Sequence, residues 1–322
     1  MNKTLTKIAV TGASTVLGAT AALSLSMPAQ AATLKGEAQG CNVFVFGNMT
    51  ASSDAEGRVC VSGNAILDLS VGTKLSPGSG DVLVVGGDLT YASGNQISGG
   101  DAIVGGTANL SPGLNIKDGE LKLEEPSIDF DAAEQFYKNY SAQLGGLNAN
   151  GETNVAYNNI TLGGVGSGRN VFNLDASDLS NASSLNITNV NADSTILVNV
   201  IGDSISAKNF QIMFDGTADK SFASNVLWNL PDATYLTSEG FSWIGSVLAP
   251  MAHYDFNNGH IDGQLITQSV SGSGEYHNIG FDGDLPEPES VPEPLTILGS
   301  GMALGFGAFF KRQQSKKQKN AN

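Results

Sequence analysis

A strand-and-turn unit recurs through the first part of the chain. Each copy has three or four apolar residues, many of them β-branched, then Gly-Asn, Gly-Asp or Gly-Thr, then another apolar residue. The corner glycines are Gly47, Gly63, Gly87 and Gly106, so the corners recur at roughly similar intervals along the chain. Glycine supplies the left-handed backbone that a sharp corner needs, and asparagine or aspartate tolerates it. Because no single unit can bury its apolar face, the repeat predicts stacked coils in a mainly β protein, a right-handed β-helix-like solenoid.

Short strands are also expected beyond the repeat. They resume between residues 154 and 214, where apolar runs alternate with polar turn residues. The closing block from Trp243 is expected to contain several short strands that turn at Pro250, Asn258-Gly259 and Asp262-Gly263.

One segment departs from the β pattern and predicts an α-helix at about residues 129–144, packed alongside the solenoid. Asp131 and Glu134 are expected to form its capping pair, and Gly145-Gly146 to end it. An aromatic stripe of this kind can serve as a ligand platform, but it more often packs on a sheet, and packing is the expectation here. The stripe at helical spacing is Phe130, Ala133, Phe136, Tyr137, Tyr140 and Leu144.

The only two cysteines are separated by about one coil. Cys41 and Cys60 each stand just before or within the strand of their unit, in the first two units of the repeat. Stacked strands are about 4.8 Å apart, within the Cα separation that a disulfide permits. The spacing predicts a Cys41–Cys60 bridge between the first two coils, where it would fasten the end of the solenoid.

Residues 1–31 have the order of a signal peptide. Lys3 and Lys7 precede an apolar run of small residues, which is expected to form the signal helix. Ala29 and Ala31 then provide the small side chains of a cleavage site, with the cut between Ala31 and Ala32. A permanent N-terminal membrane helix is the alternative, and the polar interruptions of the run argue against it.

The C-terminal end has a motif, an apolar stretch and a basic tail. The motif is Val291-Pro292-Glu293-Pro294, and residues 282–294 as a whole form an acidic, proline-rich segment that is expected to be an extended, solvated spacer. Residues 295–310 would rise about 24 Å as a helix, which can cross a bilayer core of about 30 Å when flanking basic side chains snorkel outward. Lys311 and Arg312 begin the tail 311–322, which belongs on the cytoplasmic side.

This C-terminal arrangement resembles the PEP-CTERM sorting signal of Gram-negative bacteria. The resemblance implies recognition by an exosortase-type processing peptidase, a membrane enzyme that cuts near the motif. An ordinary C-terminal membrane helix is the alternative, and it would leave the protein at the same envelope.

The part of the chain between the two ends is strongly acidic. Residues 32–310 hold 9 basic and 31 acidic residues, a net charge of −22. Such a surface repels nucleic acid, which excludes nucleic-acid binding, and attracts divalent cations. No calcium-loop motif occurs, so any calcium binding would be diffuse, and no cofactor is expected.

Several motifs together resemble the choice-of-anchor A family of bacterial surface domains. They span roughly residues 38–282, and the resemblance implies a β-helical domain over 32–281 with a helix alongside, an adhesive role, no known catalytic residues and no defined ligand. The matching parts are Asn42–Gly47, Glu56–Asn64, Val84–Asp88, the helix start from Ser127, Gly245–Pro250 and Asn258–Leu265.

The three histidines all lie in the closing block, so a metal site there has to be weighed. His253, His260 and His277 are spaced too widely and unevenly for a diagnostic ligand pattern. Coil stacking could bring His260 and His277 together near Asp262, and these three residues are weak candidates set against surface histidines. No nucleophile elbow occurs, and the glycine-rich run 163–168 lacks the lysine of a phosphate-binding loop, so an enzyme is not expected.

Together these features favour a non-enzymatic surface or extracellular-matrix adhesin that binds polysaccharide or envelope partners. It would be exported to the cell envelope, outer surface or matrix, and held in the membrane by its C-terminal anchor before processing. One alternative is a β-helical carbohydrate-active enzyme, which needs an acidic cleft; the scarcity of basic residues argues against lyase chemistry. Another is an ice-binding solenoid, which needs regular Thr-x-Thr ladders that the sequence does not show.

Overall fold

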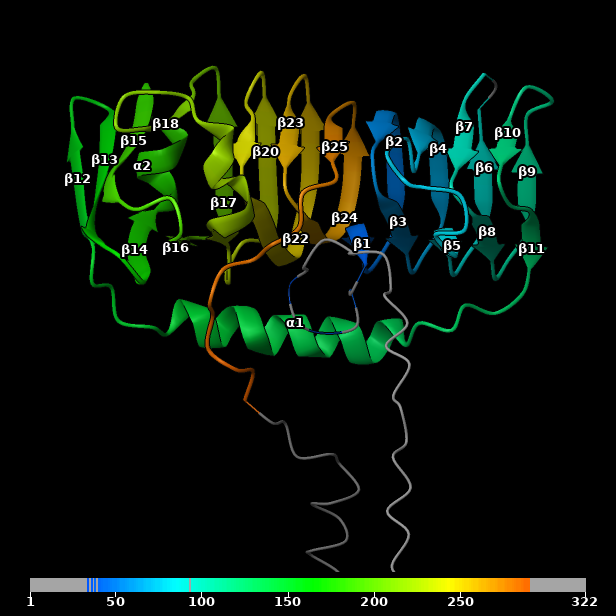
Figure 1. Ribbon diagram of the computed structural model, residues 1–322, viewed down its shortest axis with the longest axis horizontal. Coiled ribbons are helices and arrows are strands. Elements are labelled where there is room, and N and C mark those ends of the chain that lie inside the picture. The colour runs from blue at the N-terminus through cyan, green and yellow to red at the C-terminus, as the bar shows by residue number, and fades with distance from the viewer. Residues whose placement is uncertain (1–33, 35, 37, 39, 93, 290–322) are drawn as a thin grey trace, which may run out of the picture. The chain divides into compact units, whose positions relative to one another are not determined.

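The structure is a computed structural model that describes residues 34, 36, 38, 40–92 and 94–289. These residues form a parallel β-solenoid with one long helix alongside (Figure 1), which confirms the mainly β architecture. The predicted signal peptide, its cleavage site, the sorting motif, the apolar stretch 295–310 and the basic tail lie outside the described residues. Among the helices that the structure describes, none is long and apolar enough to cross a membrane.

The first half of the domain contains eleven strands, and its coils repeat as the sequence predicts. On one side of the solenoid Val43 pairs with Val59, Val59 with Leu83, Leu83 with Ala102, and Ala102 with Leu121. The strands are β1 (Cys41–Val45), β2 (Met49–Ala55), β3 (Arg58–Val61), β4 (Ala65–Val71), β5 (Asp81–Val85), β6 (Leu89–Tyr91), β7 (Gln96–Ser98), β8 (Asp101–Val104), β9 (Ala108–Leu110), β10 (Asn115–Lys117) and β11 (Leu121–Leu123).

Helix α1 (Phe130–Gly145) leads into the second half, which also contains a short helix, a 3₁₀ helix and one antiparallel strand pair, β12–β13. Its elements are β12 (Glu152–Ala156), β13 (Asn159–Gly166), β14 (Arg169–Asp175), α2 (Ala176–Ser180), β15 (Ser184–Val190), β16 (Thr195–Ile201), β17 (Ser204–Lys208), β18 (Ile212–Phe214), η1 (Lys220–Asn225), β19 (Val226–Asn229), β20 (Tyr235–Glu239), β21 (Trp243–Ile244), β22 (Ser246–Asn257), β23 (His260–Asp262), β24 (Leu265–Gly272) and β25 (Glu275–His277).

The coils are not stacked in chain order. β1 lies between β3 and β24, so Val43 pairs with Val59 on one side and with Leu265 on the other. The first half therefore grows outward from β1 to β11, α1 runs back along the solenoid, and the second half grows from the opposite end toward β1 (Figure 1). We call the contact of β1 and β2 with β24 and β25 the seam.

The disulfide lies beside the seam. Cys41 and Cys60 are joined with their Cα atoms 6.1 Å apart, on the neighbouring strands β1 and β3. The expectation that this bridge fastens the end of the solenoid is wrong, because the first coil of the chain is a central coil of the stack.

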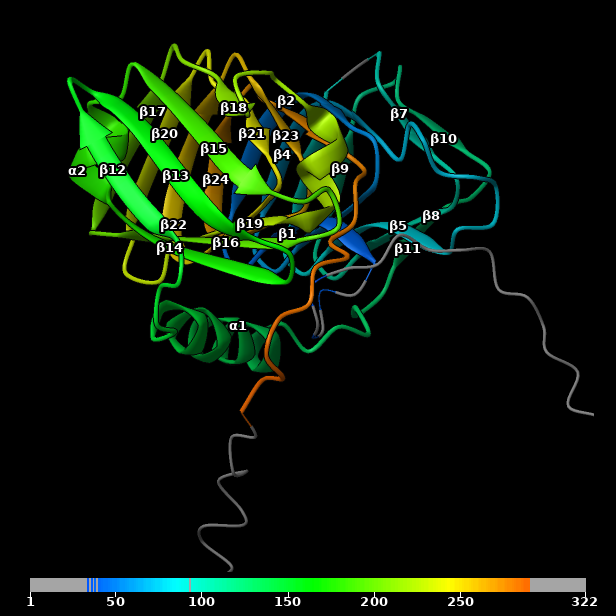
Figure 2. The same ribbon diagram turned by 60° about the vertical axis from the view of Figure 1, so that its left-hand side comes forward.

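The side of the solenoid that carries α1, the helix side, is apolar on both surfaces of its sheet. Side chains alternate along β1, so Val43 and Val45 enter the core while Phe44 faces α1, where its ring lies 6.3 Å from that of Tyr137. Burial on both surfaces explains the near-continuous apolar runs of these strands. Figure 2 shows α1 along this side. The expectation that the aromatic stripe packs on a sheet is confirmed.

The ends of α1 differ in part from the prediction. The N-cap is Asp129, whose side chain accepts a hydrogen bond from the backbone N–H of Ala132 at 2.9 Å, so the assignment of Asp131 as the cap is wrong. Asp131 instead lies in the first turn, where a negative charge favours the helix dipole. The helix does end at the two glycines, and the N–H of Gly146 donates to the carbonyl of Ala142.

A ladder of buried asparagines connects α1 to the strands beneath it. Asn199 and Asn229, on the paired strands β16 and β19, are fully buried, and Asn229 Nδ2 donates to Asn199 Oδ1 at 2.9 Å. Asn199 Nδ2 donates in turn to the carbonyl of Leu144 at 3.0 Å, and Asn229 Nδ2 to that of Ser141 at 2.9 Å. Buried amides need such partners, so the ladder fixes the position of the last turns of α1.

Three further expectations need correction. The corner residues Gly63 and Gly87 do not have positive φ; glycine is required because a Cβ would meet the backbone of the preceding coil. Pro250 does not end a strand, because β22 continues through it and passes a corner where its register with β24 shifts. Residues 282–289 are not a free spacer, since Leu285 is buried and the carbonyl of Pro286 accepts a hydrogen bond from the Tyr140 hydroxyl.

Candidate functional site

The candidate functional site is the outward surface of the sheet that follows the helix side around each coil. We call it the polar face; its strands are β17, β20, the second half of β22, the end of β24, β2, β4, β6 and β9. Their registers place one outward side chain from each strand in a row across the sheet. The row is Ser206, Thr237, Asp255, Ser271, Thr50, Ile66, Thr90 and Asn109.

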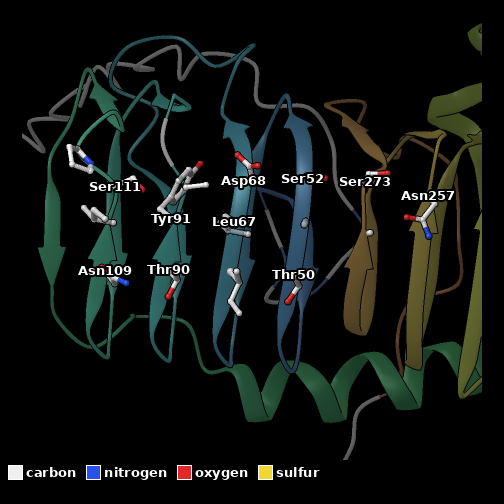
Figure 3. Close-up of a pocket in the computed structure, with 16 residues that line it drawn as sticks. Thr50, Ser52, Leu67, Asp68, Thr90, Tyr91, Asn109, Ser111, Asn257 and Ser273 are labelled. Carbon is white, nitrogen blue, oxygen red and sulfur yellow. The ribbon is translucent and has the colours of Figure 1, made fainter.

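An open groove of about 690 Å³ crosses this face over β22, β24, β2, β4, β6 and β9 (Figure 3). Six parallel strands about 4.8 Å apart give it a length of about 24 Å. Thr50, Thr90 and Asn109 present hydroxyl and amide groups, while Ile66 is 56% exposed and contributes an apolar surface. The groove therefore presents polar side chains on both sides of one exposed apolar side chain.

Few groups in the groove can titrate. Among the described residues that line it, Asp68 is the only carboxylate, and its Oδ1 accepts a hydrogen bond from Asn95 Nδ2 at 2.7 Å. Tyr91 forms part of the floor, donates its hydroxyl to the carbonyl of Leu69, and is buried, which raises its pKa. Glycoside hydrolysis uses two carboxyl groups about 5–10 Å apart, and the described groove offers one.

The charged side chains of the polar face lie mainly on its other half. Lys208, Glu239 and Asp255 are on β17, β20 and β22, and Lys208 pairs in register with Glu239. His253 lies in the same region, where Nδ1 is 2.8 Å from the hydroxyl of Ser269. The face as a whole is thus a mixed surface and not a uniform ladder of threonines.

One edge of the face is held by a second polar ladder at the Gly-Asn and Gly-Asp corners. Asn48 Oδ1 accepts from the N–H of Asn64, and Asn64 Oδ1 from the N–H of Asp88, both at 2.8 Å. Asp88 accepts from the backbone N–H and the hydroxyl of Thr107, which lowers its pKa. These repeated bonds keep neighbouring coils in register, and the corner motif of the sequence is their visible sign.

A separate polar cluster lies on β23 and β25, on the third side of the solenoid. The structure brings His260, Asp262 and His277 together, with ligand atoms within 4.8 Å of one another. His277 Nδ1 is 2.5 Å from Asp262 Oδ1, and His260 Nε2 is 3.2 Å from Asp262 Oδ2. Lys220, on η1, places Nζ 3.1 Å from Asp262 Oδ2.

The electrostatics of this cluster follow from the burial of Asp262. Burial alone would raise the pKa of the carboxyl group, but the contacts of Asp262 with His260, His277 and Lys220 outweigh it, so the pKa of Asp262 is lowered. The hydrogen bond to Asp262 raises the pKa of His277. Asp262 therefore stays ionised and favours a cation beside it.

Sequence reasoning found part of these sites. It singled out His260, Asp262 and His277, and the spacing of the two histidines corresponds to one coil. It did not find Lys220 as a member of the cluster, because η1 approaches from a distant part of the sequence. It also missed the groove, although the residue three positions after each corner glycine marks its row, as Thr50, Ile66 and Thr90 show.

The chain is similar to known adhesive and ice-binding proteins. The family model that matches residues 35–278 is described as "Putative Ice-binding-like adhesive domain". A search of the curated proteins found no match. An ice-binding protein from the Arctic yeast, LeIBP, is 14% identical, with 83% of this chain and 100% of that chain covered and a TM-score of 0.37.

Two further solved structures have the same kind of similarity. The ice-binding protein of the Antarctic ascomycete Antarctomyces psychrotrophicus is 12% identical over 77% of this chain and 98% of that one, with a TM-score of 0.36. The DUF3494 domain of ice-binding protein 1 from Shewanella frigidimarina is 12% identical over 79% of this chain and 98% of that one, with a TM-score of 0.35. Since the family model covers most of the described domain, the chain belongs to the family of ice-binding-like adhesive domains.

Proposed function

We propose that this protein is a non-enzymatic surface adhesin that binds extracellular polysaccharide through the groove of its polar face. The observation that carries the proposal is the row Thr50, Ile66, Thr90 and Asn109 on four adjacent strands. A sugar ring has hydroxyl groups at its edge and C–H groups on its faces, so it matches a surface on which polar side chains flank an exposed apolar one. An open groove about 24 Å long accommodates several rings of a chain without enclosing an end.

The experiment is retention of the full chain on immobilised exopolysaccharide, with and without a chelator. Ile66→Lys and Thr90→Lys place a long cation in the groove and are expected to reduce retention at least tenfold. Val155→Lys is the matched control, because Val155 is also an exposed strand residue, on β12 outside the polar face. Equal retention of all three variants would show that the groove is not the binding surface. Loss of retention in chelator alone would indicate calcium bridges instead.

Ice binding is the second candidate, favoured by the family description and by the uncharged row in the groove. Asp255, in the same row, and Glu239 and Lys208 beside it carry charges across the other half of the face. This interruption favours the adhesive function. Thermal hysteresis and ice-recrystallisation assays on the same variants distinguish the two: an ice-binding face would be impaired by Thr90→Lys in the absence of any polysaccharide.

We infer from the two ends of the sequence that the protein is exported and then anchored at the envelope by its C-terminal sorting signal. The support is the order of charged, apolar and small residues around Ala29 and Ala31, and the motif at Val291–Pro294 before an apolar stretch. Cell fractionation tests this: Pro292→Ala with Pro294→Ala should leave the unprocessed chain in the membrane, if an exosortase-type peptidase acts on the motif. Unchanged processing of that variant would favour an ordinary membrane anchor.

A further inference from the structure

The cluster at His260, Asp262 and His277 is built by the pairing of two strands. His260 and Asp262 alternate with Ile261 on β23, so their side chains leave the same surface of the strand. Asp262 pairs in register with His277 on β25, which places the second imidazole beside the carboxylate. The two imidazole rings are stacked with their centroids 4.8 Å apart. All three side chains therefore face one point.

Asp262 is buried and incompletely satisfied. It is 1% exposed, and its Oδ2 accepts no hydrogen bond within the described residues. Oδ2 has two neighbours, Lys220 Nζ at 3.1 Å and His260 Nε2 at 3.2 Å. A buried carboxylate oxygen is costly unless a cation lies against it, and the Lys220 ammonium group is the cation that lies against Oδ2 in this structure.

The second nitrogen of each imidazole faces an oxygen. His260 Nδ1 lies 3.0 Å from the hydroxyl of Ser242, and His277 Nε2 lies 3.6 Å from the carboxylate of Glu275. In metal sites the nitrogen that does not bind the ion is oriented in this way by an outer acceptor. The nitrogens that remain, His260 Nε2 and His277 Nδ1, are the ones directed at Asp262.

Lys220 marks the position of a cation. Its Nζ lies 3.0 Å from His260 Nε2, and since an ammonium group has no lone pair, it can only donate there. His260 Nε2 therefore presents its lone pair to the point that the ammonium group approaches. The side chain of Lys220 is 56% exposed, so it can turn into solvent and leave this point to another cation.

We propose that His260 Nε2, His277 Nδ1 and the carboxylate of Asp262 bind a divalent transition-metal ion of the zinc class. Zinc takes imidazole nitrogen and carboxylate oxygen at about 2.0–2.2 Å in tetrahedral geometry, so neighbouring ligand atoms are about 3.3 Å apart. The 3.2 Å between His260 Nε2 and Asp262 Oδ2 matches this separation. His277 Nδ1 and Asp262 Oδ1 are 2.5 Å apart in a hydrogen bond, so these two atoms would move apart when the ion replaces the shared proton. Two imidazoles exclude calcium and magnesium as the preferred ions, since these take oxygen ligands.

The ion would also act on the seam. His277 ends β25, the carbonyl of His277 accepts a hydrogen bond from Asn42 Nδ2 at 2.9 Å, and the next residue, Asn278, donates its N–H to Glu56 at 3.0 Å. Both partners belong to the first coil of the chain. A metal that holds β25 to β23 therefore stabilises the contact between the first and the last coil.

Zinc and cobalt titration of the full chain, purified without a polyhistidine tag, tests the proposal. Calorimetry is expected to show one high-affinity Zn²⁺ per chain, and Co²⁺ is expected to give the visible absorption of a tetrahedral nitrogen and oxygen site. His260→Gln and His277→Gln should weaken binding at least tenfold. His253→Gln, the remaining histidine of the chain, should leave the affinity within twofold of that of the wild type.

A variant that removes no ligand keeps the test independent of folding. Lys220→Met deletes the competing ammonium group and should tighten zinc binding several-fold. Thermal unfolding in chelator identifies any histidine variant that fails to fold. The proposal is overturned if the wild type binds no zinc, if Lys220→Met weakens binding, or if His253→Gln loses as much affinity as the cluster variants.

Discussion

The hydroxyl of Ser141, on the buried surface of α1, donates a hydrogen bond of 2.6 Å to Oδ1 of Asn229 on β19. Asn229 returns a hydrogen bond to the carbonyl of the same serine. This reciprocal pair joins the helix to the second half of the solenoid, while the aromatic residues of α1 pack on strands of both halves, including Phe44. The helix is thus fastened on each side of the seam.

Asn229→Leu is expected to lower the free energy of unfolding by about 2–3 kcal/mol. The substitution leaves buried polar groups of Ser141 and Asn199 without partners, and each such group costs about 1–3 kcal/mol. Urea unfolding followed by circular dichroism measures the change. Asn173→Leu is the control, because Asn173 lies at the exposed end of the same ladder and should cost less. Equal losses for the two variants would contradict the role given to the buried pair.

Replacing Cys41 and Cys60 with alanine is expected to lower the free energy of unfolding by about 3 kcal/mol, the scale for closing a loop of this length. Because the bridge lies centrally, the whole domain should unfold at lower denaturant together. The two tryptophans, Trp228 and Trp243, are in the second half and report on it by fluorescence. A fluorescence midpoint that stays unchanged while circular dichroism shifts would show that the halves unfold separately.

Gly87→Ala is expected to destabilise the domain by about 1–3 kcal/mol, the range for an overpacked site. The new Cβ would meet the backbone of Gly63 on the preceding coil at 2.9 Å. Gly163→Ala is the matched control, since its nearest neighbour would be 3.9 Å away and its backbone suits alanine. The control should equal or exceed the wild type in thermal midpoint. A similar loss at both positions would mean that backbone freedom matters and close approach does not.

In chelator, the domain is expected to lose stability as the pH rises above about 6.5, the ordinary pKa of histidine. The raised pKa of His277 comes first from its hydrogen bond to Asp262, with the charge of Glu56 adding to it, while burial and Lys220 act in the opposite direction. A group whose folded pKa is raised stabilises the fold fully below its unfolded pKa, and this stability is lost as the pH passes the folded pKa. His277→Gln should remove the slope in urea unfolding, and His253→Gln should keep it.

The sequence predicted the local structure well because that structure depends on neighbouring residues. The stripe from Phe130 to Leu144 predicted α1, and the corner glycines predicted the spacing of the coils. The order of the coils could not be predicted, because a repeat shows that units stack without showing which pairs are adjacent. The pairing of Val43 with Leu265 joins residues near opposite ends of the domain's sequence, and nothing local specifies it.

Some residues of the candidate sites could likewise be predicted from the sequence, and others could not. His260 and His277 are one coil apart, so stacking was enough to suggest their proximity, whereas Lys220 arrives through a 3₁₀ helix that no repeat includes. The asparagine ladder was missed, although Asn199 and Asn229 each interrupt an apolar run at the same register. The proline content of residues 282–289 predicted a solvated spacer. The segment instead packs on the domain through the buried side chain of Leu285 and the backbone carbonyl of Pro286, and composition does not predict such contacts.

The seam also sets the order in which the domain can be completed. β1 is among the first strands to be synthesised, yet one of its two edges gains a partner only when β24, the second-to-last strand, follows. Such distant pairing slows folding, because a long loop must close before its contacts contribute. Until then the nascent chain keeps an open edge and an unfinished core. For the export that we propose, this delay would hold the polypeptide in a form that can still be threaded across a membrane.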